Sequence, residues 1–318
     1  MAYTAGDSIL DDEYNDFVGS SSSPFGYNHF AGTGSGEYGL NQTSIATVSA
    51  GGTITASSWN SLFTGLDNIA NHTNVSITSS SVSAGDAIAV RSALISDLAS
   101  LAAAVAAGST SATAISTPAA AGSSSNSATW NSTSTIERSI TFANSATMRA
   151  FFNAGGYIRI DPSCTTGIDG SKDDVFNDLT TTAIDNLDLK AHITSRSGSG
   201  ETLTTDGLAN GFHELSTGYT VLLKLTSDNS GYTSNTVEIS AKLDAAPATA
   251  TVLTIKMVST DPADDNTYTA GNTDGVPANP DEAPIMVLAL LEAYPTDAEG
   301  LAADIRAASN AEVSNSQS

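Results

Sequence analysis

The sequence predicts an α+β fold, in which a region of extended and helical segments precedes a mainly antiparallel β-sandwich domain with two inserted helices. Apolar residues recur at helical spacing in the first third of the 318-residue chain, whereas they alternate at period two along most of the second half. Between these parts lies a stretch made almost only of Ser, Thr, Ala, Asn and Gly. We therefore expect an N-terminal region at 1–107, a linker at 108–134 and a β-rich domain at 135–318.

A repeated segment marks the N-terminal region. Ala5–Ile9 precedes Tyr14–Phe17 with the same spacing by which Ala50–Ile54 precedes Trp59–Leu62, and both pairs share an Ala-Gly, an Ile and an aromatic–Asn pair. A partial third copy, Ala84–Ile88, lacks the aromatic–Asn pair. The two complete copies predict the same local structure, namely a glycine turn, a short extended piece and a helix anchored by an aromatic side chain.

Two longer helices are expected in this region. The first has Ser57 or Ser58 as its N-cap, and the second runs roughly from Ala87 to Ala107. Their apolar stripes form the predicted interaction residues, which are Trp59, Leu62, Phe63 and Leu66 on the first helix and Leu94, Leu98, Leu101 and Val105 on the second. The second stripe has heptad spacing, which fits either a helix packed within its own domain or a three-stranded seam in a homotrimer.

A different pattern fills residues 20–39, where Gly, Ser and aromatic residues predominate. Such a segment cannot close a core alone, and we expect it to lie extended along a neighbouring molecule.

The β-rich half contains six segments with period-two alternation, at 136–142, 157–160, 221–225, 237–243, 253–257 and 285–291. Short connections such as Asp228–Gly231 predict an antiparallel meander, and hence a sandwich. The two inserted helices are expected at Ser145–Asn153, which ends before Gly155 and Gly156, and at Asp173–Leu187.

Charge and composition exclude several classes of protein. The chain carries 34 acidic and 11 basic residues, which gives a net charge of −23, so it would repel nucleic acid. Its apolar runs are too short to span a membrane. The single cysteine, Cys164, cannot form an internal disulfide. Because the first residues lack the basic and apolar parts of a signal peptide, we expect a protein kept inside a cell or in a particle assembled there.

We find no catalytic motif, so the chain is not expected to be an enzyme, and no catalytic or cofactor-binding residue is predicted. Two acidic loops offer oxygen ligands that Ca²⁺ could use, although solvated loops are the simpler interpretation. The candidate calcium ligands are Asp169, Asp173, Asp174, Asp261, Asp264 and Asp265.

Four segments resemble virion structural proteins of tailed bacteriophages, especially marine phages that infect cyanobacteria. They are Ala50–Thr73, Ser139–Ser145, Met148–Gly156 and Ser197–Gly200. The resemblance covers most of the chain and implies a place in the virion among other virion proteins, after assembly in the host cytoplasm. It implies no catalytic residues.

Two functions are therefore expected. The first is a tail, neck or baseplate fibre or adaptor, a homo-oligomer and by the heptad a trimer, which docks through its N-terminal region and projects the β domain. The alternative is a receptor-binding tip or capsid decoration protein, whose exposed tyrosines Tyr219, Tyr232 and Tyr268 would contact host surface glycans.

Overall fold

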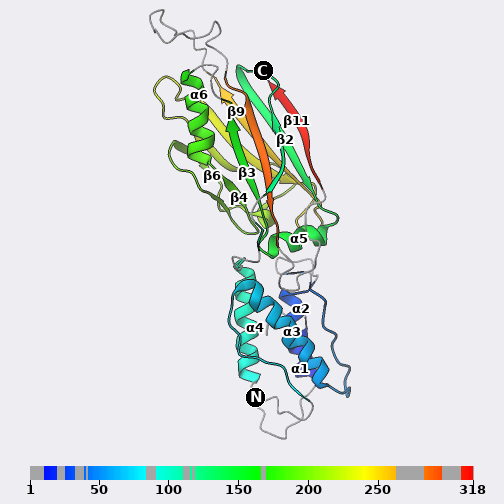
Figure 1. The fold of residues 1–318 in the computed structure, drawn as a ribbon. Coiled ribbons are helices and arrows are strands. Elements are labelled where there is room, and N and C mark those ends of the chain that lie inside the picture. The colour runs from blue at the N-terminus through cyan, green and yellow to red at the C-terminus, as the bar shows by residue number, and fades with distance from the viewer. Residues whose placement is uncertain are drawn as a thin grey trace, which may run out of the picture. The chain divides into compact units, whose positions relative to one another are not determined.

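The computed structural model describes residues 11–19, 26–32, 39–40, 42–83, 91–109, 115–116, 119–165, 170–262, 283–295 and 309–317. The chain divides into two compact units, which are described separately (Figure 1). The helical unit comprises residues 1–117, 145–156 and 294–306. The sandwich unit comprises residues 118–144, 157–293 and 307–318.

The helical unit is built around Trp59. Its helices are α1 (Asp11–Val18), α2 (Tyr27–Phe30), α3 (Ala56–Thr73), α4 (Arg91–Ala106) and α5 (Ser145–Asn153). The Trp59 ring lies 5.3 Å from the ring of Tyr14, 6.0 Å from Phe17 and 5.9 Å from Phe63, measured between centroids. The aromatic residues of the two complete repeat copies therefore pack against each other.

Helix α3 begins with a capping box. The Thr55 hydroxyl accepts a hydrogen bond from the Ser58 N–H, and the Ser58 hydroxyl accepts one from the Thr55 N–H. The expectation of Ser57 or Ser58 as N-cap was wrong, because Thr55 holds the extended backbone of the cap and Ser58 is the third helical residue. The helix ends at Asn74, whose φ of 58° lies in the left-handed region.

The sandwich unit contains two antiparallel sheets, which confirms the predicted sandwich. The five-stranded sheet has the order β1-β10-β3-β4-β5, and the six-stranded sheet has the order β11-β2-β9-β8-β7-β6. The strands are β1 (Ala119–Ser125), β2 (Ser132–Thr141), β3 (Tyr157–Cys164), β4 (Leu187–Leu189), β5 (Thr194–Arg196), β6 (Thr202–Asp206), β7 (Thr220–Thr226), β8 (Thr236–Leu243), β9 (Val252–Asp261), β10 (Met286–Ala293) and β11 (Ser309–Gln317). All six predicted strand segments overlap with one of these strands.

A helix packs against the sheets of this unit. Helix α6 (Gly170–Asn177) continues as a π-helix, η1 (Asp178–Ile184), and a 3-10 turn, η2 (Phe212–Glu214), follows later. The predicted helix at 173–187 therefore ends at Ile184, and Leu187 already belongs to β4. The other predicted inserted helix, α5, has the expected bounds but groups with the helical unit.

The interpretation of residues 108–134 as a linker was wrong for much of its length. Strand β1 lies inside this segment and pairs with β10 from Ala119 to Ser125, and β2 begins at Ser132. The Ala, Gly and Ser side chains of β1 give no alternation, and its ladder depends on a partner far along the chain.

Among the described helices, none combines the length and apolar character needed to cross a membrane.

Candidate interaction sites

Asparagine side chains of the helical unit bind extended backbone segments. The Asn15 amide on α1 donates to the carbonyl of Val48 (2.8 Å) and accepts from the N–H of the same residue (2.7 Å). The Asn60 amide on α3 makes the same pair of bonds to Val82, at 2.9 and 2.8 Å. Each amide thus occupies both backbone groups of one residue, as a neighbouring β-strand would. We call this arrangement an amide clamp.

The amide clamps give the sequence repeat a structural meaning. Asn15 and Asn60 hold the same place in the two complete copies, and each binds a Val that stands two residues before the Ala-Gly of the following copy. The shared sequence is therefore Val-Ser-Ala-Gly, at Val48–Gly51 and at Val82–Gly85. Of the repeat copies, Ala5–Ile9 and Ala84–Ile88 lie outside the described residues.

Two further side chains hold the same extended segments. Asn28 on α2 clamps Ile45 with bonds of 2.8 and 2.9 Å. The buried Asp97 carboxylate on α4 accepts from the N–H groups of Thr78 (3.0 Å) and Ser79 (2.8 Å). The two extended segments, 42–55 and 74–83, are therefore each fixed at two points by helix side chains, although none of their residues belongs to a strand.

We predict that Asn60→Asp lowers the free energy of unfolding of the helical unit by about 1–2 kcal/mol. The carboxylate still accepts from the Val82 N–H but places a second acceptor against the Val82 carbonyl. Urea unfolding followed by Trp59 fluorescence, in a shared W130F background, measures the change. Asn71→Asp, at an exposed position of the same helix, is the control for the added charge. Equal losses in both variants would contradict a role for the clamp.

The predicted interaction residues are all buried within the chain itself. Exposed fractions are 9% for Phe63 and 3% or less for the other seven, which are Trp59, Leu62, Leu66, Leu94, Leu98, Leu101 and Val105. Of the two interpretations of the heptad, packing within its own domain is the one that this burial fits, because α4 packs against α3. The stripes are a core and present no surface to a second chain.

Part of the segment 20–39 also packs inside its own unit. Tyr27 and Phe30 on α2 are buried, and the Tyr27 ring lies so close to Gly65 that a Cβ there would approach it to 2.7 Å. Burial raises the pKa of Tyr27 to about 12. For its described residues, the expectation that this segment lies along a neighbouring molecule was therefore wrong.

His72 is the buried histidine of the helical unit. Its Nε2 lies 2.9 Å from the Ala154 carbonyl, which follows α5. Burial lowers the pKa of His72 below its ordinary value of 6.5, and the bond to Ala154 opposes this only in part. The neutral ring thus joins α3 to the end of α5.

This burial predicts a pH-dependent stability. Because the folded pKa is lowered, the unfolded chain takes up a proton first, so stability falls as the pH drops below about 6.5. His72→Gln is expected to flatten this slope between about pH 7 and 5.5, since Gln does not titrate and can still donate to Ala154. Urea midpoints against pH provide the measurement, with His192→Gln in the sandwich unit as the control. Parallel slopes for His72→Gln and the parent would refute the assignment.

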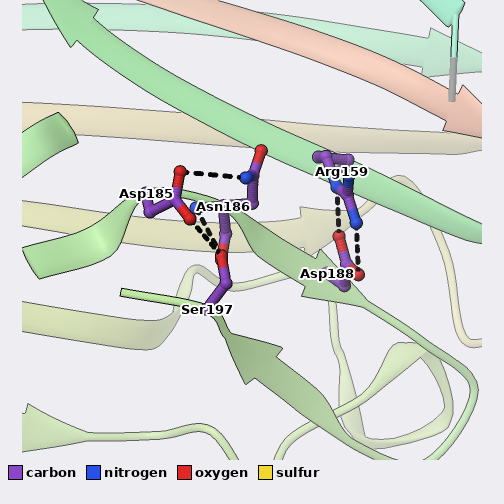
Figure 2. Close-up of polar contacts among 5 residues, drawn as sticks. All are labelled: Arg159, Asp185, Asn186, Asp188 and Ser197. Atoms are coloured by element: carbon purple, nitrogen blue, oxygen red, sulfur yellow. Dashed lines mark hydrogen bonds and ion pairs between the residues drawn. The ribbon is translucent and has the colours of Figure 1, made fainter. Parts of the chain in front are cut away.

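The outer face of the five-stranded sheet carries paired charges. Arg159 on β3 lies opposite Asp188 on β4, and the two form a two-pronged ion pair at 2.8 and 3.0 Å (Figure 2). The Arg159 guanidinium and the Lys190 ammonium each lie 5.6 Å from the Tyr157 ring centroid. Burial, with a smaller effect of Asp185, raises the pKa of Asp161 on the same face. On this face, Arg159 and Asp188 therefore engage each other, and Arg159 and Lys190 both engage Tyr157.

Asp185 ends the π-helix beside this face. Its φ of 54° lies in the left-handed region, and its carboxylate accepts from the Ser197 hydroxyl (2.7 Å) and the Asn186 amide (3.0 Å) (Figure 2). At Gly198 a Cβ would meet the carbonyl oxygens of Thr182 and Ala183 at 2.4 and 2.5 Å. The Ser-Gly stretch 197–200 therefore closes the end of a helix.

The proposed calcium ligands do not form a site among the described residues. Asp261 is fully buried and its Oδ2 lies 2.9 Å from the Lys172 ammonium, so a cation of the chain already occupies this carboxylate. Asp173 is buried and Asp174 is exposed. Asp169, Asp264 and Asp265 lie outside the described residues. Within the part of the chain that the structure describes, no three His, Cys, Asp or Glu side chains gather as metal ligands.

Two of the tyrosines proposed to contact glycans can be placed. The Tyr219 ring has the ammonium groups of Lys256 and Lys242 at 3.9 and 4.4 Å from its centroid, so protein cations already engage this ring. Tyr232 is half-buried in the turn between β7 and β8. Tyr268 lies outside the described residues.

Cys164, the single cysteine of the chain, lies at the end of β3. It is half-buried, and burial raises the pKa of its thiol to about 11, which makes it a poor nucleophile at neutral pH.

Comparison of the chain with models of protein families, with curated proteins and with solved structures finds no match in any of the three.

Proposed function

We propose that the chain is a structural component of a tailed-phage virion, in the tail, neck or baseplate, where the helical unit docks and the sandwich unit projects. The observation that carries the proposal is where the phage-like segments lie. Ala50–Thr73 forms the capped start and the body of α3, and Ser197–Gly200 closes the π-helix. The resemblance therefore concerns the framework of the fold.

The most specific phage-like segment, Met148–Gly156, supports the same proposal. Phe151 and Phe152 are fully buried and pack edge to face at 5.0 Å, and Asn153 donates to the carbonyl of Gly39 at 2.9 Å. Gly155 takes the left-handed conformation that ends α5, with a φ of 85°. The phenylalanine pair and Asn153 therefore stabilise the fold, and Gly155 ends the helix, which is what a structural protein would require.

The experiment is mass spectrometry of virions whose genome encodes this chain, purified from an infected culture by density-gradient centrifugation. We expect the chain in the particles at a fixed ratio to the other virion proteins. Antibodies raised against the sandwich unit should bind intact particles, whereas antibodies against the helical unit should bind only disrupted ones. Presence of the chain in infected cells but not in the purified particles would overturn the proposal.

The receptor-binding tip or decoration protein remains the alternative, with host glycans as partners. It predicts that the purified chain binds host cells and blocks adsorption of the phage. The heptad spacing no longer supports a trimer, since its four apolar residues are buried within one chain. They are Leu94, Leu98, Leu101 and Val105. A homo-oligomer is still proposed, on the basis of the C-terminal strand β11.

A further inference from the structure

The C-terminal strand β11 is attached without an apolar anchor. It lies at the edge of the six-stranded sheet and pairs antiparallel with β2 from Ser309 to Gln317. Its two apolar side chains, Ala311 and Val313, are exposed, Val313 to 52%. The attachment therefore consists of the backbone ladder and polar side chains, for which water competes.

Those polar side chains connect β11 to the other sheet and to the turn after β1. Asn310 accepts from Arg138 at 2.7 and 3.1 Å and donates to the Leu290 carbonyl at 3.3 Å. Asn315 donates to the Ser125 carbonyl at 2.7 Å, and Gln317 donates to the Ala128 carbonyl at 2.5 Å. The contacts are specific in position, because each amide meets a fixed backbone group.

The sheet edge that β11 joins is stabilised by other residues of the sandwich. Arg138 on β2 is buried and donates to the Ser124 hydroxyl on β1 at 2.5 Å. Gly122 leaves room for this guanidinium, since a Cβ there would lie 2.3 Å from an Arg138 nitrogen. The guanidinium thus has a partner that does not belong to β11.

The chain between β10 and β11 is long. Residues 294–308 separate the two strands, and a fully extended chain of this length would reach about 50 Å. No short turn ties β11 to its partner β2.

The free side of β11 is poorly suited to a further strand. The register with β2 shifts between Glu312 and Ser314, which leaves Val313 as a bulge. Strand β6, at the opposite edge of the sheet, has a similar shift between Leu203 and Thr205. Bulges on edge strands disfavour the addition of another strand. A second molecule is therefore better accommodated by exchanging β11 than by pairing beside it.

We propose that β11 is exchanged between copies of this chain, so that the β11 of one copy pairs with β2 of its neighbour. Every hydrogen bond described above can form within one chain or between two, so exchange loses none of them. The balance between the two arrangements therefore depends on the length of the segment 294–308 and on the local concentration of the chain. A closely packed assembly provides that concentration. The proposal goes beyond the virion role and does not require it.

A cysteine pair distinguishes the two arrangements. Ser309 and Thr141 are register partners, so S309C and T141C, in a C164S background, bring two thiols together across β11 and β2. We expect oxidation of the concentrated protein to give mainly covalent dimers and larger species on non-reducing gels. The control pair T236C and T260C, between β8 and β9 of one hairpin, should give a disulfide within the chain.

Each other outcome overturns the proposal. A disulfide formed only within the chain, shown by loss of free thiols at monomer mobility, places β11 on its own β2. Failure to form any disulfide, in a variant whose thermal unfolding matches that of the C164S parent, removes the β11–β2 register on which the proposal rests.

Discussion

Replacing Lys172 by Met is expected to lower the free energy of unfolding of the sandwich unit by about 3–5 kcal/mol. Lys172 on α6 and Asp261 at the end of β9 are both fully buried, and their charged atoms lie 2.9 Å apart. Removal of the ammonium leaves a buried carboxylate without this counter-charge, and such a loss is larger than the net stabilisation by the pair itself.

The double variant K172M/D261L distinguishes the effect of an unpaired buried charge from the effect of losing the ion pair itself. With both charges removed, we expect most of the stability to return, since apolar residues of similar size often replace a buried ion pair without loss. Trp130 reports on this region, because its ring packs edge to face on Phe176 of α6 at 5.3 Å. Urea unfolding is followed by Trp130 fluorescence in a shared W59F background. A double variant as unstable as K172M would show that lost packing, and not an unpaired charge, explains the change.

The same ion pair shows what the sequence cannot predict about a candidate site. Asp261 stands in an acidic run that suggests a cation site, and the cation that it meets is a lysine 89 residues earlier in the chain. Local acidity indicates that a positive partner is needed but not which one. Among the proposed calcium ligands, this reason applies to Asp261, whose carboxylate the Lys172 ammonium already engages.

Strands were predictable where side chains alternate between core and solvent. In β2, the buried Ile136 and Ile140 alternate with half-buried residues, and the period-two signal follows directly. Strands β1 and β11 carry Ser, Ala, Gly and Asn without such alternation, and their pairing depends on partners more than a hundred residues away. Their backbone ladder, which leaves no mark on the sequence, decides the structure.

The amide clamps were only partly predictable from the sequence. The repeat contains an aromatic–Asn pair, and the helical spacing of apolar residues predicts a role for the aromatic residue but none for the Asn. The repeated sequence extends backwards to Val-Ser-Ala-Gly, because Val82 precedes the third Ala-Gly as Val48 precedes the second. Since Asn15 clamps Val48 and Asn60 clamps Val82, the repeat is a unit of helix and clamped segment.

Trp59→Ala is expected to have a comparably large effect, confined to the helical unit. The side chain is 3% exposed and joins Tyr14, Phe17 and Phe63, so its removal leaves a cavity among three rings and lowers the free energy of unfolding by about 3–5 kcal/mol. Hydrogen exchange measured by mass spectrometry should show α3 losing protection while β8 and β9 keep theirs. The two sets of peptides thus report on the two units in one experiment.

Trp59→Phe is the matched control for this loss. It keeps an aromatic ring against Tyr14 and Phe63 and removes an indole N–H that has no hydrogen-bond acceptor among the described residues. Part of the lost packing is therefore offset, and we expect a decrease of about 1–2 kcal/mol. Loss of protection in β8 and β9 along with α3 would show that the two units unfold together, and would contradict separate cores. Retained protection in the sandwich would mean that the helical unit can open alone, as two separate cores would allow.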